Sequence, residues 1–271
     1  MNRVMAACAF AALVAVTLVS VQCDLVSGGP PTEVQIVADS DTTVVLVWAP
    51  PAEGTPSAYL VSFKEVGKQA YAPLGQTEDT MFFHNPHGVT GHYKVMAQFG
   101  GETYEALTKP STVPILTDTL FLGELNAATS AGYGWRRETG AGAVFAMDDR
   151  LNEKEVDFYV TDFNLGFSGP KYWIASPDLG PTDPGGGVPV AGWRVSGFTP
   201  ALVYEDAPLP AYAPNYYLEK QRIDTVPMAV ACRTEDGYFA LVKFTRQETG
   251  LGRVQVKSWF QLVKGLRLIK H

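Results

Sequence analysis

Hydrophobic and polar residues alternate along many short segments of this chain. In segment 92–99, Tyr93, Val95, Ala97 and Phe99 fall on one face and mostly polar residues on the other, which is typical of a half-buried strand. Similar short runs lie at 43–48, 58–63, 80–83, 104–107, 156–163, 171–175, 188–198, 225–233, 238–244 and 254–261. Only 147–156 is ambiguous between strand and helix. We therefore predict an all-β protein.

The segments 225–233 and 238–244 form the clearest predicted hairpin, with Asp236-Gly237 at its tip. In the next strand, Trp259 falls on the face that carries polar Gln255 and Lys257. Either a bulge reverses the alternation and buries Trp259 under the hairpin, or the ring lies outside the core and could touch a ligand. We favour the bulge.

The first residues have the order of an export signal. Arg3 precedes an uninterrupted apolar run, Val4 to Val21, and turn-forming residues follow at 27–31. We expect residues 1–22 to be a signal peptide and 23–31 a linker. An uncleaved membrane anchor is the alternative, because the run is just long enough to span a bilayer.

Length and composition limit the function classes. A chain of 271 residues suits two domains, and 26 Gly and 19 Pro suit many short strands joined by turns. The net charge of −7 argues against nucleic acid and against electrostatic docking to anionic lipid. The three cysteines, Cys8, Cys23 and Cys232, offer no disulfide framework once Cys8 leaves with the signal. We expect Cys232 to be a buried free thiol.

The N-terminal half resembles a fibronectin type III domain over residues 32–115. The resemblance is carried by Val44-x-Leu46-x-Trp48-x-x-Pro51, Tyr59-x-Val61 and Tyr93-x-Val95-x-Ala97. It implies an immunoglobulin-like sandwich in which Trp48 and Tyr59 are structural and Tyr93 makes a tyrosine corner. The stretch 84–92 is longer than the usual approach to that tyrosine, so we expect the corner to be closed differently.

Two further resemblances concern the protein's localisation. Ser20-Val21-Gln22-Cys23 is similar to a lipobox but has Gln22 where a small residue is usual. Lipidation of Cys23 and cleavage nearby without a lipid both stay open. Residues 233–242 with 259–261 weakly resemble C-terminal hairpins of secreted bacterial β-sandwich lipoproteins. We expect an exported protein, anchored in the cell envelope or secreted, whose membrane contact is a lipid on Cys23 or an uncleaved signal.

Residues 116–271 are predicted to form a second β-sandwich domain. The stretch 111–118 contains Pro114 and separates two sets of strands. Cutting there is expected to yield two fragments that each fold.

Histidines and acidic residues are the candidate metal or catalytic groups. His84, His87 and His92 could ligate zinc or copper, but no carboxylate lies near them in sequence, and we expect an ordinary polar turn. Asp148-Asp149 are expected in a solvated turn. Asp157 and Asp162, five apart on one strand, should lie on opposite faces; calcium binding and glycoside hydrolysis are the alternatives for these carboxylates.

Aromatic residues are the remaining candidates for a ligand-binding site. Tyr133 and Trp135 lie in a glycine-rich segment beside two arginines, where rings are expected to be presented and could stack on a sugar. Without a nucleophile elbow, phosphate loop or catalytic Cys/His pair, we expect no enzyme and no cofactor. The sequence therefore indicates an adhesion, display or binding module with a fibronectin-like spacer, whose partner could be a glycan or another envelope protein. A glycan-processing enzyme or carbohydrate-binding module in the C-terminal domain is the alternative.

Overall fold

The computed structural model describes residues 28–163, 171–179, 190–203 and 208–271. The predicted signal segment, Cys23 and the first residues of segment 188–198 lie outside these ranges. The described residues form seventeen strands, all paired antiparallel, and three short 3-10 helices, which confirms the all-β prediction. In the same ranges, no helix has the length and apolarity that crossing a membrane requires.

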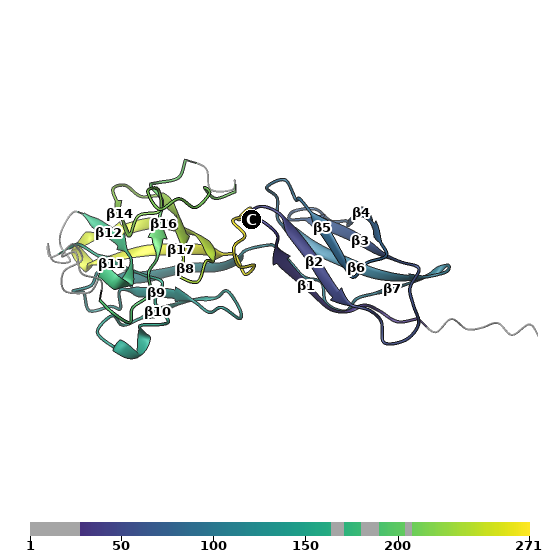
Figure 1. The fold of residues 1–271 in the computed structure, drawn as a ribbon. Coiled ribbons are helices and arrows are strands. Elements are labelled where there is room, and N and C mark those ends of the chain that lie inside the picture. The colour runs from purple at the N-terminus through teal and green to yellow at the C-terminus, as the bar shows by residue number, and fades with distance from the viewer. Residues whose placement is uncertain (1–27, 164–170, 180–189, 204–207) are drawn as a thin grey trace, which may run out of the picture.

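The N-terminal lobe is a sandwich of a three-stranded and a four-stranded sheet, in the orders β1-β2-β5 and β4-β3-β6-β7 (Figure 1). This arrangement is that of a fibronectin type III-like fold. Its strands are β1 (Thr32–Ala38), β2 (Val44–Ala49), β3 (Ala58–Glu65), β4 (Ala72–Thr77), β5 (Met81–His84), β6 (Gly91–Phe99) and β7 (Glu102–Glu105).

Aromatic side chains fill the space between these two sheets. Trp48 is 5% exposed and meets Tyr59 edge to face, with ring centroids 5.2 Å apart. Tyr93 is fully buried and its hydroxyl lies 2.8 Å from His84 Nδ1. The corner is therefore closed by the His84 side chain, which also packs against Phe63.

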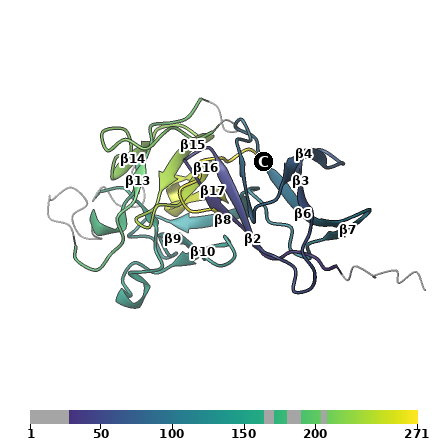
Figure 2. The same ribbon diagram turned by 45° about the vertical axis from the view of Figure 1, so that its right-hand side comes forward.

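The second lobe is a sandwich of two five-stranded sheets, in the orders β10-β9-β11-β12-β14 and β13-β15-β16-β17-β8 (Figure 2). Its strands are β8 (Ile115–Gly123), β9 (Gly132–Trp135), β10 (Gly142–Phe145), β11 (Phe158–Thr161), β12 (Tyr172–Ala175), β13 (Gly197–Phe198), β14 (Lys220–Ile223), β15 (Met228–Arg233), β16 (Phe239–Glu248) and β17 (Arg253–Phe260). The 3-10 helices are η1 (Arg150–Asn152), η2 (Pro177–Leu179) and η3 (Thr249–Leu251).

The predicted hairpin joins β15 to β16, with Gly237 at φ 86° in its turn. This left-handed conformation favours glycine. The ambiguous stretch 147–156 holds η1, whose backbone N–H at Leu151 is capped by the Asp149 carboxylate. Cys232 on β15 is fully buried, and burial raises the pKa of its thiol well above the ordinary value.

Strand β17 keeps a strict alternation, which corrects the expected bulge before Trp259. Val254, Val256 and Phe260 all point into the central core between the sheets. The register shifts instead reflect extra residues in the two partner strands. Strand β8 has one extra residue between its pairs with Val256 and Ser258, and β16 has one extra residue between Phe244 and Arg246. Trp259 is buried on the opposite face of the sheet, 6% exposed, and its ring stacks on His271 at 4.1 Å rather than under the 236–237 turn.

The last ten residues, 262–271, run back across both lobes and are called here the C-terminal clasp. The C-terminal end lies where the two lobes meet (Figure 1). Val263, Leu266 and Leu268 are buried in the same hydrophobic cluster as Trp48, within the N-terminal sandwich. The limits 32–115 and 116–271 stay predictions, but the core of the first lobe includes residues from the far end of the chain.

Polar contacts hold the clasp at several points. Arg267 Nε lies 2.8 Å from the Asp41 carboxylate, and Lys270 Nζ lies 3.1 Å from Glu65. Buried Gln261 donates from its side-chain amide to the carbonyl of Thr112, at 2.8 Å, and to that of Leu268, at 2.7 Å. The clasp therefore ties the connection between the lobes to the N-terminal core.

Candidate functional site

Tyr133 and Trp135 do not present their rings, which corrects the expectation from the sequence. The two side chains are 0% and 3% exposed and lie in the central core of the second lobe. The Trp135 ring stacks on Phe260 at 5.2 Å, and its indole N–H donates to Ser258 Oγ at 3.0 Å. Tyr133 shares a 2.7 Å hydrogen bond with the same hydroxyl. Neither ring is available to a sugar.

The glycines beside these rings allow other parts of the chain to pack closely against the backbone, and they do not make the segment flexible. A Cβ at Gly134 would lie 1.7 Å from the Glu155 carbonyl oxygen, and a Cβ at Gly142 would lie 1.8 Å from the Tyr133 hydroxyl. Glycine is required where backbone or side chains pack this tightly. The glycine-rich sequence was therefore a sign of packing, not of presentation.

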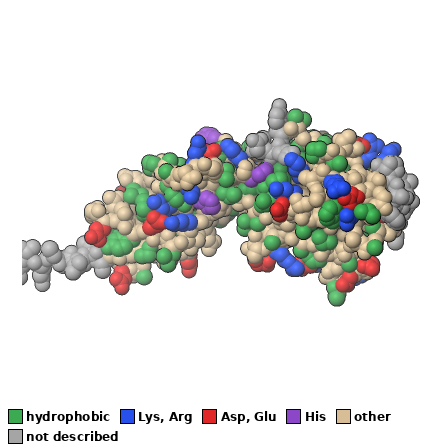
Figure 3. All heavy atoms as spheres, turned by 180° about the vertical axis from the view of Figure 1, so that it is seen from behind, with side chains coloured by type: hydrophobic (Ala, Val, Ile, Leu, Met, Phe, Trp, Pro, Cys, Tyr) green, Lys and Arg blue, Asp and Glu red, His purple; other side chains and the backbone are tan. Residues whose placement is uncertain are grey.

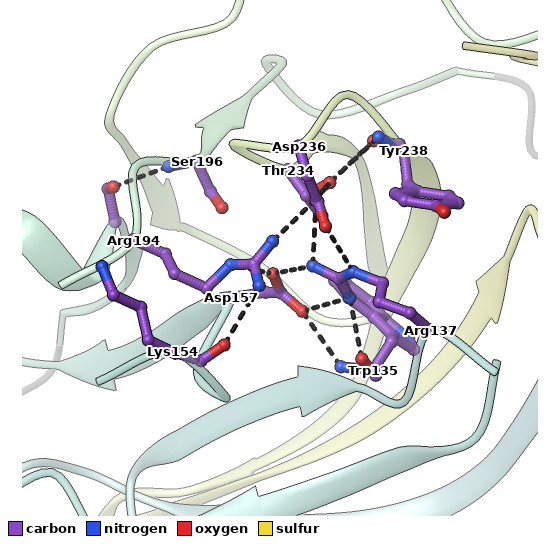
Figure 4. A network of polar contacts seen from close by, with 10 residues as sticks. Trp135, Arg137, Lys154, Asp157, Arg194, Ser196, Thr234, Asp236 and Tyr238 are labelled. Atoms are coloured by element: carbon purple, nitrogen blue, oxygen red, sulfur yellow. Dashed lines mark hydrogen bonds and ion pairs between the residues drawn. The ribbon is translucent and has the colours of Figure 1, made fainter. Parts of the chain in front are cut away.

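Two arginines and two aspartates of the second lobe form a closed ion-pair network (Figure 4). Arg137 binds Asp157 at 2.7 Å and Asp236 at 2.7 Å. Arg194 reaches the same two carboxylates, at 3.1 Å and 2.7 Å. The Trp135 backbone N–H also donates to Asp157, at 3.0 Å. The network joins segments that lie far apart in sequence.

The charges of this network are internally balanced. Burial would raise the pKa of Asp236, but hydrogen bonds from Arg137, Thr234 and Arg194 outweigh it and hold that pKa well below the ordinary value. Burial would lower the pKa of Arg137, and its hydrogen bonds to Asp157 and Asp236 raise it instead. Because each arginine pairs with both aspartates, the network is suited to holding distant segments together rather than to proton transfer.

A surface cleft of about 670 Å³ lies at the edge of the second sandwich. We call it the Trp173 cleft. It draws on β12, β14, the end of β15 and the loop before β14. Its lining includes Trp173, Ser196, Tyr212, Tyr217, Lys220 and Arg233.

Aromatic rings form much of the cleft wall. Tyr212 is 46% exposed, Trp173 is half-buried and Tyr217 is buried. Tyr217 is anchored by a hydrogen bond from its hydroxyl to the Pro210 carbonyl, at 2.7 Å, and lies 5.6 Å from the Tyr212 ring. Trp173 is supported by Phe163 at 5.2 Å. The walls can therefore offer ring faces to a ligand.

Polar groups converge on the same space. Ser196 is 2% exposed, and its hydroxyl has no hydrogen-bond partner among the described residues, although its backbone N–H donates to Ser176 Oγ. A buried hydroxyl without a partner is uncommon in folded proteins and needs an explanation. Ser196 is among the residues that line the cleft, but its hydroxyl oxygen is buried beneath the surface.

The three candidate histidines are not brought together. His84 is engaged with Tyr93, and burial, then the charge of His87, lower its pKa. No group of three or more His, Cys, Asp or Glu side chains that could hold a metal occurs within the described part of the chain. Figure 3, which views the two lobes from behind, shows histidine side chains at separate points of that face.

The acidic candidates also take separate positions. Asp148 and Asp149 are exposed at η1. Asp157 belongs to the arginine network, whereas Asp162 lies by Glu124, whose Oε1 accepts from the Asp162 backbone N–H at 3.4 Å. Glu124 is fully buried; burial and the neighbouring Asp162 charge raise its pKa despite a hydrogen bond from the Asn126 backbone. Glu124 does not line the Trp173 cleft, the surface cleft described above.

Sequence reasoning missed the cleft. Trp173 was visible as one of several tryptophans in the second half of the chain, but Tyr212 and Arg233 stand in a Pro-rich loop and at a strand end, with no shared motif. Their meeting depends on the pairing of β13 with β15 and of β12 with β14, which no local spacing indicates.

No family model and no curated protein matches the chain. Among solved structures, "Titin kinase and its flanking domains" is similar at 11% identity and a TM-score of 0.29, over 88% of this chain and 38% of that chain. The chicken CNTN1 FN1–FN3 domains are similar at 10% identity and a TM-score of 0.24, over 87% and 89%. This chain therefore spans well under half of the titin chain. The fold assignment rests on the strand order, not on these weak likenesses.

Proposed function

We propose that this protein is an exported, non-enzymatic binding module whose second sandwich binds a carbohydrate in the Trp173 cleft. The N-terminal sandwich is its spacer. The observation that carries the proposal is the convergence, in one cleft, of the exposed Tyr212 ring and the half-buried Trp173 ring. Sugars have apolar faces that stack on aromatic rings and hydroxyls that need hydrogen-bond partners.

The small number of carboxylates among the described residues of the cleft favours binding over glycan hydrolysis. Hydrolysis of a glycosidic bond ordinarily uses two carboxyl groups about 5–10 Å apart, across the scissile bond. Glu219 is the one carboxylate among the described lining residues. The buried Glu124 and the arginine-paired Asp157 are not part of this lining.

A glycan array probed with the full chain tests the proposal, followed by titration of each hit. Tyr212→Ala is expected to weaken binding by about tenfold or more, since stacking of one aromatic ring is worth on the order of 1 kcal/mol beyond its buried area. Tyr216→Ala is the matched control, because Tyr216 is 39% exposed in the same loop but does not line the cleft. Equal losses in the two variants, or an array without hits, would reject the site.

Export is supported by the apolar run and turn-forming cluster at the N-terminus. Intact-mass measurement of the mature protein is expected to show that residues 1–22 are absent; a retained Met1 would reject cleavage. If Cys23 carries a lipid, Cys23→Ser moves the protein from the membrane fraction to the soluble fraction. An unchanged distribution would reject a lipid on Cys23 as the membrane anchor.

A further inference from the structure

The cleft contains a cation, Arg233, for which the described part of the chain offers no ion pair. Arg233 has no carboxylate partner within the described ranges, whereas the other arginines there, at positions 136, 137, 150, 194, 222, 246, 253 and 267, each pair with an Asp or Glu. Its guanidinium carbon lies 4.1 Å from the centroid of the Tyr212 ring. The ring therefore supports the planar group, and no carboxylate of the described residues pairs with its N–H groups.

A second cation lines the same cleft. Lys220 Nζ lies 6.0 Å from the Trp173 ring centroid and 5.1 Å from that of Phe163, and it too has no ion pair in the described part of the chain. Against these two cations stands one lining carboxylate, Glu219. The described lining of the cleft is thus locally positive on a chain whose net charge is −7.

We infer that the ligand of the Trp173 cleft is an acidic saccharide, a sugar whose carboxylate is bound by Arg233; this inference rests on the proposed function. A guanidinium binds a carboxylate through two parallel N–H···O hydrogen bonds, and it does so better than it binds neutral hydroxyls. The sugar ring lies against Trp173 or Tyr212. The cation and the exposed ring of the cleft thereby both gain a partner.

Matched acidic and neutral probes test this inference on the full chain. Oligosaccharides that contain glucuronate, galacturonate or sialate are titrated calorimetrically beside their methyl esters, which keep the sugar and replace the charged carboxylate by an uncharged group with one added methyl. We expect at least one acid to bind about tenfold or more tightly than its ester, as hydrogen bonds to charged groups exceed those to neutral ones. The preference is also expected to shrink as salt is raised.

Variants test whether Arg233 is the source of the preference for the acid over its ester. Arg233→Gln is expected to reduce binding of the acid to the level of the ester, and Arg233→Lys to retain part of the difference because it keeps the charge without the planar fork. Arg246→Gln, on an exposed arginine paired with Glu248, is the control and is expected to change neither. Thermal melting checks that every variant is folded.

The outcomes distinguish a failure of the acidic-saccharide inference from a failure of the proposed carbohydrate binding. Equal binding of acids and esters, tighter binding of neutral sugars, or a preference that survives Arg233→Gln overturns the acidic ligand while carbohydrate binding stands. Binding of no saccharide, acidic or neutral, overturns the proposed function itself.

Discussion

Leu268 and Ile269 are neighbours in sequence, yet their side chains are buried in the cores of different lobes. Leu268 lies in the cluster of Trp48 and Val95 in the N-terminal sandwich. Ile269 lies with Trp259 and Leu241 on the outer face of a sheet in the second. Extended chain turns successive side chains to opposite sides, so a clasp of this kind can seal two cores at once.

Truncating these two neighbours should therefore destabilise different lobes. Leu268→Ala is expected to cost about 2–5 kcal/mol in the N-terminal sandwich, the usual range for a buried leucine. Ile269→Ala is the matched control and is expected to lower protection in the second sandwich instead. Hydrogen exchange resolved by segment measures both. Loss of protection in the same lobe for both variants would contradict this account of the clasp.

The clasp also changes what is expected of fragments. A fragment of residues 28–116 lacks Val263, Leu266 and Leu268, which are buried in its core. We expect it to melt at a lower temperature than the N-terminal lobe of the whole chain, or without cooperativity. The same fragment joined through a Gly/Ser linker to residues 262–271 should recover. If the short fragment alone melts like the whole chain, the clasp contributes nothing and the independent folding expected from the sequence holds.

Acid should weaken the arginine network through Asp236. Its folded-state pKa is depressed, so the stability it contributes is fully present above the unfolded pKa, near 4, and is lost as pH falls through the folded value. Asp236→Asn is expected to cost about 1–3 kcal/mol at pH 7 and to flatten the fall in melting temperature below pH 4. Exposed Asp148→Asn is the control. A pH profile that keeps its wild-type shape in Asp236→Asn would reject this role.

Trp48→Ala is expected to destabilise the N-terminal sandwich by about 3–5 kcal/mol, because it leaves a cavity between the two sheets. This loss is comparable with the whole stability of a small domain. Thermal and denaturant unfolding, together with hydrogen exchange in β3 and β6, measure this loss of stability. A melt within a few degrees of wild type would show that Trp48 is not an essential part of the inter-sheet core.

Trp135 and Trp259 show where sequence patterns stop being informative. Both were judged from their neighbours in the chain, and Trp135 was expected to be the presented ring. Its indole is instead satisfied by Ser258, 123 positions away, and covered by Phe260. Trp259 is buried as expected, but the clasp covers it through His271. In both cases the covering residues come from distant segments, which local patterns do not identify.

The all-β class, the 228–248 hairpin and the sandwich around Trp48 were determined by the sequence itself, because a strand's two-residue period and a turn's residue types are local properties. The tertiary structure decided which polar and aromatic groups meet. Arg137 reaches Asp236 across 99 positions, and Arg233, Tyr212 and Trp173 line one cleft only because separate strands pair. Exposure and charge pairing depend on neighbours that folding brings together, so the location of the candidate site emerged only with the fold.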